Sequence, residues 1–110
     1  MDIVETREGE TAIVALVGAL DTSSSPALTA KAFALCGTGI RALVVDLDRV
    51  PHLTSAGFRA FIAIKRRCAT GAIQMTLCGC NDLVREMFEI GGMLGTFRIV
   101  ADREAALQAD

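Results

Sequence analysis

The chain has 110 residues, of which 52% are apolar and 22% charged, so it can bury the core of one domain, which we expect to span residues 1–110. A net charge of −2 and a pI near 5.3 argue against nucleic acid as a partner, because proteins that bind phosphate backbones present a strongly basic face. Apolar runs such as residues 12–20 are shorter than the roughly 20 residues of a membrane-spanning helix, and the acidic N-terminus does not resemble a secretion signal. We therefore expect a cytoplasmic protein without direct membrane insertion.

The first half of the chain predicts two strands, a helix, a strand and a second helix. β-branched residues on both sides of the polar turn at residues 8–10 indicate an antiparallel pair of strands. Hydroxyl residues and a proline then precede a helix over residues 26–36. The continuous apolar run at 41–48 is typical of a strand covered on both faces, and residues 56–70 have the spacing of an amphipathic helix.

The second half predicts two further strand and helix pairs. We expect strands at residues 72–79 and 96–100, and helices at residues 81–92 and 102–109. The resulting order, ββαβαβαβα, predicts an α/β fold with a mostly parallel central sheet and an antiparallel N-terminal strand.

Two segments of the chain carry a family resemblance. "VVDLDRVPHLTSAGFRAF" at residues 44–61 resembles the signature of the STAS domain family, in which a strand and a short loop lead to Asp-Ser-Ser-Gly-Leu at the start of a helix. "VGALD" at residues 17–21 resembles the Gly-x-x-Asp turn that follows the second strand of that family. The predicted element order also matches, so the chain looks like a single STAS domain of the kind found in bacterial anti-sigma-factor antagonists.

The resemblance assigns roles to individual residues. Ser55 takes the place of the serine that family members present to a protein kinase, and Thr54 stands where many members have an aspartate. The residues that the resemblance places on the partner-binding surface are Asp21, Thr54, Ser55, Ala56, Gly57 and Phe58.

Local chemistry suggests structural roles for some of the same residues. A hydroxyl residue directly before a helix is a good N-cap, and its loss typically costs about 1 kcal/mol, so Thr54 is predicted to cap the helix over 56–70. Asp21 is predicted to cap the approach to the helix over 26–36. A phosphate on Ser55 would add about −1.5 to −2 charges next to the positive end of a helix dipole.

The resemblance implies a non-enzymatic protein that binds an anti-sigma-factor serine kinase while Ser55 is unmodified. Phosphorylation would release the kinase, and a phosphatase would restore binding. A first alternative is a STAS subunit of a membrane-transport ATPase complex, which docks without phosphorylation. A second alternative is a phosphate-accepting receiver-like domain that uses Asp46 or Asp48.

We expect no cofactor and no metal, and a monomer or weak dimer. The four cysteines, at positions 36, 68, 78 and 80, are predicted to be reduced thiols in a cytoplasmic chain. "CGC" at residues 78–80 has ligand-like spacing, but a second pair of ligands is missing and His52 is the only histidine.

Overall fold

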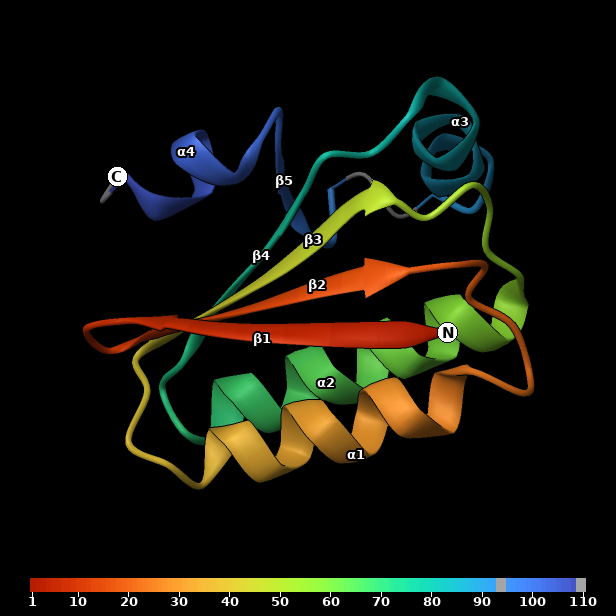
Figure 1. Cartoon of the computed structure of the whole chain (residues 1–110). Coiled ribbons are helices and arrows are strands. Elements are labelled where there is room, and N and C mark those ends of the chain that lie inside the picture. The colour runs from red at the N-terminus through yellow and green to blue at the C-terminus, as the bar shows by residue number, and fades with distance from the viewer. Residues whose placement is uncertain (93–94, 109–110) are drawn as a thin grey trace.

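A five-stranded sheet forms the centre of the computed structural model, which describes residues 1–92 and 95–108 (Figure 1). Its strands follow one another in chain order, β1-β2-β3-β4-β5. The antiparallel pair at one edge consists of β1 (Asp2–Glu8) and β2 (Thr11–Val17). The remaining strands, β3 (Ala42–Arg49), β4 (Gln74–Cys78) and β5 (Arg98–Val100), each run parallel to their preceding neighbour. The predicted mixed sheet is therefore confirmed.

Four helices connect or follow these strands: α1 (Ser25–Cys36), α2 (Ser55–Thr70), α3 (Asp82–Ile90) and α4 (Arg103–Leu107). Helices α1 and α2 lie side by side along one face of the sheet, and α4 lies on the opposite face (Figure 1). The element order is the predicted ββαβαβαβα. Because β2, β3 and β4 are parallel to one another, α1, α2 and α3 begin at the same end of the sheet, beyond the carboxyl ends of these strands.

The core lies mainly between the sheet and the first three helices. Alternate residues of the strands, such as Leu43, Val45 and Leu47 of β3, are fully buried in this cluster, as the period of two in a strand requires. The intervening Val44 is buried on the opposite face, against Ala106 of α4. Strand β3 is therefore covered on both faces, as its continuous apolar sequence predicts.

An ion pair attaches α4 to the sheet. The guanidinium of Arg103 donates to Oδ2 of Asp46 at 2.9 and 3.1 Å. Gly79, in the turn after β4, has φ +77°, and a Cβ there would lie 2.9 Å from Oδ1 of Asp46. Glycine therefore supplies both the backbone conformation and the space that the carboxylate of Asp46 requires.

Several predicted boundaries need correction. Strand β4 starts at Gln74 and not at residue 72, because Ala72 has φ +57° and belongs to the preceding turn. Strand β5 is limited to three residues, and Phe97 before it is buried in the core without belonging to the strand. Helix α4 ends at Leu107; Ala109, at the end of the predicted helix, and the C-terminal residue of the predicted domain lie outside the described residues. No helix within residues 1–92 and 95–108 is long and apolar enough to cross a membrane.

Candidate functional site

Two loops run side by side at the carboxyl ends of β2 and β3, and they join the two segments that the sequence singles out. Leu20 and Leu53 form a parallel bridge. The N–H of Leu20 donates to the carbonyl of His52 at 3.2 Å, and the N–H of Thr54 donates to the carbonyl of Leu20 at 2.9 Å. These backbone bonds place the turn that starts at Asp21 next to the start of α2.

Thr54 occupies the N-cap position of α2, but its side chain does not cap the helix. Its backbone is extended, with φ −107° and ψ −179°, and its hydroxyl forms no capping hydrogen bond. The carbonyl of Thr54 accepts from the N–H of Gly57 at 2.9 Å and of Phe58 at 3.2 Å. The predicted position is correct and the predicted side-chain hydrogen bond is wrong, because the N–H of Gly57, which a side-chain cap would bind, donates to the carbonyl of Thr54 instead.

Ser55 is the first residue of α2, and its side chain is exposed. The first turn of α2 contains no acidic residue, so the partial positive charge of this helix end is not compensated within the helix. The first N–H groups of a helix also have no partner inside it. The position therefore combines a solvent-accessible hydroxyl with an environment that favours a negative charge.

Gly57 allows α2 to approach the loop that contains Leu20. Gly57 is buried, and a Cβ at this position would lie 3.1 Å from Cδ2, 3.2 Å from Cγ and 3.3 Å from the carbonyl oxygen of Leu20. Such contacts are tighter than a normal packed interior allows. Glycine is thus explained here by close packing and not by backbone conformation.

Phe58 links the first turn of α2 to α3. Its half-buried ring meets the ring of Phe88 edge to face, with centroids 5.1 Å apart and an interplanar angle of 88°. Phe61 stacks on the same Phe88 ring at 6.1 Å, and Phe97 completes the aromatic cluster. Edge-to-face and offset pairs of this kind are favourable beyond their buried area, so they fix the position of the site relative to the core.

Asp21 organises the turn before α1. Its Oδ1 accepts from the N–H groups of Ser23 at 2.9 Å and Ser24 at 3.0 Å, and from the hydroxyl of Ser23 at 2.8 Å. Its own carbonyl accepts from the N–H of Ser25 at 2.9 Å. The hydrogen bond from the Ser23 hydroxyl, with the backbone bond from Ser24, lowers the pKa of the Asp21 carboxyl below its ordinary value. The predicted structural role of Asp21 at the approach to α1 is confirmed.

Asp46 and Asp48 do not form the acidic pair of a receiver domain. The carboxylate of Asp46 pairs with Arg103 and accepts from the backbone N–H of Asp48 at 3.0 Å. Receiver-type doubly wound sheets have the strand order 2-1-3-4-5, whereas the present sheet has the order 1-2-3-4-5 with an antiparallel edge. The receiver hypothesis is therefore wrong.

The cysteines are free thiols. Cys36 and Cys68 lie with their sulfur atoms 3.9 Å apart, between the C-terminal ends of α1 and α2. Burial raises the pKa of the Cys68 and Cys78 thiols to about 12, so both are neutral near pH 7. Over residues 1–92 and 95–108, no three histidine, cysteine or acidic side chains gather as a metal site would require.

Comparison with known proteins identifies the family. The model of the STAS domain matches residues 3–106. The chain belongs to the STAS domain family. BtrV of Bordetella bronchiseptica, which bears the name of an anti-sigma factor antagonist, is 33% identical to this STAS domain over 97 residues, covering 88% of this chain and 84% of BtrV.

Solved structures of similar fold include an anti-sigma factor antagonist from Mycobacterium paratuberculosis, with a TM-score of 0.87 and 22% identity over 96% of this chain and 90% of that chain. The antagonist SpoIIAA in its unphosphorylated form has a TM-score of 0.73 and 18% identity over 94% of this chain and 92% of that chain. The phosphorylated form of Bacillus SpoIIAA has a TM-score of 0.72 and 18% identity over 94% of this chain and 96% of that chain. These likenesses show the fold.

Three residues that shape this end of the STAS domain are not predicted from the sequence. Leu20 binds Thr54 through its carbonyl and packs under Gly57, and nothing in the local sequence indicates this contact. Ser25 and Arg59 line a groove next to the first turn of α2. The position of Arg59, one helical turn after Ser55, is a signal that could have identified it.

Proposed function

We propose that this STAS domain is an anti-sigma-factor antagonist that binds a serine kinase of the anti-sigma type while Ser55 is unmodified. The observation that carries the proposal is the exposed hydroxyl of Ser55 at the first position of α2, in a turn without acidic residues. The family membership and the naming of BtrV as an anti-sigma factor antagonist support the choice of partner.

In this proposal the partner contacts both loops at the carboxyl ends of β2 and β3. The backbone bonds between Leu20 and Thr54 hold these loops together, so the contact surface is formed in advance and little ordering accompanies binding. The proposed partner-binding residues are Asp21, Thr54, Ser55, Ala56 and Phe58; Gly57, predicted on the same surface, is buried and supports it from beneath by packing against Leu20.

Phosphorylation of Ser55 would change the charge of this surface without unfolding the domain. A negative group at a helix N-terminus is stabilising, typically by 0.3–1 kcal/mol. The same group opposes a partner that packs tightly or presents carboxylates over the helix end. The near-equal likeness of this fold to both forms of SpoIIAA is in line with a phosphate that leaves the fold intact. A phosphatase would restore the unmodified surface.

The domain would thus act by binding in the cytoplasm and not by catalysis. Titration calorimetry of Ser55→Ala and Ser55→Asp against a purified serine kinase of the anti-sigma type from the same organism tests the proposal. We expect Ser55→Ala to bind like the wild type and Ser55→Asp to bind at least about tenfold more weakly, a loss of about 1.4 kcal/mol.

The control is Gln74→Glu, which adds the same charge at an exposed residue at the start of β4, the opposite end of the sheet. Gln74→Glu should bind within about twofold of the wild type. Equal binding by Ser55→Ala and Ser55→Asp, with no phosphate gained by the wild type from ATP, would contradict the proposal and favour docking in a transport ATPase complex.

A further inference from the structure

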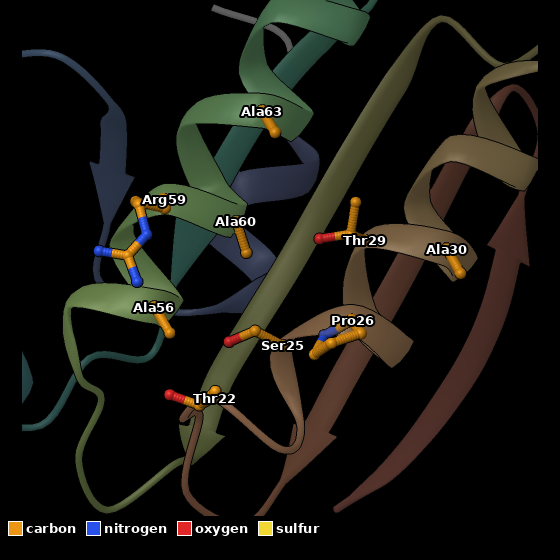
Figure 2. A pocket seen from close by; sticks show the side chains of 9 residues that line it. All are labelled: Thr22, Ser25, Pro26, Thr29, Ala30, Ala56, Arg59, Ala60 and Ala63. Atoms are coloured by element: carbon orange, nitrogen blue, oxygen red, sulfur yellow. The ribbon is translucent and has the colours of Figure 1, made fainter.

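A groove runs between α1 and α2 directly beside the first turn of α2 (Figure 2). It has a volume of about 500 Å³. Ala56, Ala60 and Ala63 line it from α2, and Pro26 and Ala30 line it from α1. The three alanines follow one another at intervals of four and three residues and so lie on one face of α2. Such short side chains leave room for the ridge of another helix.

A buried hydroxyl points into this groove. Ser25, the first residue of α1, is only 6% exposed, and its Oγ has no hydrogen-bond partner among the residues that the structure describes. Figure 2 shows the hydroxyl directed across the groove toward α2. A buried polar group without a partner lowers the stability of a fold by about 1–3 kcal/mol. The Ser25 hydroxyl is therefore a group in the groove wall that lacks a hydrogen bond.

Of the described residues that line the groove, Arg59 is the one that carries a charge. Its side chain lies back along α2 toward Ala56 (Figure 2), and within residues 1–92 and 95–108 it forms no ion pair with a carboxylate. An apolar groove with a single cation at its rim is complementary to a segment with apolar side chains and a negative group.

We infer that the groove receives a helix of the partner kinase that carries apolar side chains and one carboxylate, with Arg59 pairing the carboxylate and Ser25 bonding a polar group of that helix. The inference rests on the proposed function, because the groove is continuous with the Ser55 surface through Ala56. Insertion of an amphipathic helix into a groove between elements is a common mode of recognition.

This arrangement gives Arg59 a role in release. Ser55 and Arg59 are one helical turn apart on the same side of α2, and arginine binds phosphate through charge-assisted hydrogen bonds. A phosphate on Ser55 therefore repels the carboxylate of the partner and also competes with it for Arg59.

Titration calorimetry tests the inference. All variants are made in the Ser55→Ala protein, the parent, which has no hydroxyl at position 55 to accept a phosphate. The titrant is the same purified serine kinase of the anti-sigma type. Arg59→Glu should weaken binding about tenfold or more, as expected for loss of a charge-assisted contact. Its control is Arg66→Glu, an exposed arginine of the same helix outside the groove, which should bind within about twofold of the parent.

A second pair of variants tests the shape of the groove. Ala30→Gln places a longer side chain in the groove and should weaken binding about fivefold or more through steric exclusion. Ala27→Gln, at an exposed position of α1 that does not line the groove, should bind within about twofold of the parent.

Ser25→Ala separates docking from folding. Removing the unpaired hydroxyl should leave the melting temperature unchanged or raise it, and should weaken binding about threefold, as expected for one neutral hydrogen bond. A merely structural Ser25 would produce the opposite pattern, with a lower melting temperature and unchanged affinity.

The outcomes distinguish this inference from the proposed function. If Arg59→Glu and Ala30→Gln bind like their controls while Ser55→Asp still binds weakly, the groove inference is wrong and the proposed function stands. If these variants alter self-association in sedimentation velocity and leave kinase binding unchanged, the occupant is a second copy of the chain and the inference is wrong. If the parent protein does not bind the kinase, both are overturned.

Discussion

Replacing Gly57 by alanine should destabilise the domain, although alanine is the better helix former. A Cβ at Gly57 would meet the side chain of Leu20 at 3.1 and 3.2 Å and its carbonyl oxygen at 3.3 Å. Leu20 has little freedom to move, because it is fully buried and its backbone bonds both His52 and Thr54. The clash therefore has to be relieved by a shift of α2 or of the neighbouring loop.

The expected magnitude follows from two opposing contributions. Adding a methyl group to a packed core typically costs 1–3 kcal/mol, and replacing glycine by alanine in a helix gains roughly 1 kcal/mol. We expect a net loss of about 1 kcal/mol for Gly57→Ala. In a Leu20→Ala background the two closest side-chain contacts are absent, so the same change should become neutral or stabilising. The coupling between the two substitutions should then be about 1–3 kcal/mol.

Urea unfolding of the four proteins of this double-mutant cycle measures the coupling. Leu20→Ala alone should cost about 2–5 kcal/mol, so all four proteins are compared in the same concentration of trimethylamine N-oxide, which stabilises folded states. The matched control is Gly37→Ala, where the added Cβ would lie at an ordinary 3.5 Å from the carbonyl of Ala34. A coupling near zero, or a Gly57→Ala protein as stable as Gly37→Ala, would refute the packing argument.

Three further predictions concern the same end of the domain and its thiols. Thr54→Ala should cost less than about 0.5 kcal/mol in urea unfolding, because the hydroxyl does not cap α2; a loss of 1 kcal/mol or more would show a side-chain cap. The pKa of the Asp21 carboxyl is lowered in the folded state. The ionised carboxylate therefore stabilises the fold above its ordinary pKa of 3.8, and this stabilisation is lost as the pH falls. The stability difference between wild type and Asp21→Asn should therefore shrink below about pH 4, and a constant difference would contradict this. At pH 8 a disulfide reagent should label the half-buried Cys36 well before Cys68, whose pKa is about 12; equal rates in the folded protein would contradict the burial of Cys68.

The order and type of the elements could be predicted from the sequence because each has a clear local signal. The glycine at position 9 separates two β-branched runs, and Asn81 caps α3 through a hydrogen bond from the N–H of Val84 at 2.7 Å, as an asparagine before a helical pattern predicts. Boundaries were less accurate where the backbone leaves the strand conformation without a residue that indicates it, as at Ala72.

The contacts that complete the site could not be predicted, because they join residues far apart in the chain. The hydrogen bond from the N–H of Thr54 to the carbonyl of Leu20 joins residues 34 positions apart and fixes the start of α2, and the ion pair between Asp46 and Arg103 spans 57 positions. Local sequence indicates which residues favour a helix start, but it does not show which neighbouring loop binds the backbone of the N-cap residue.

The most direct test of the central claim is a phosphorylation and release experiment with the wild-type protein and a purified serine kinase of the anti-sigma type from the same organism. The complex is formed with ADP, separated by size-exclusion chromatography, and then incubated with ATP, after which intact mass and peptide mapping locate any phosphate. We predict a stable complex with ADP, a single phosphate on Ser55 after ATP, and dissociation of the phosphorylated domain from the kinase. A phosphate on Thr54, a phosphorylated domain that stays bound, or an unmodified domain after ATP would contradict the account.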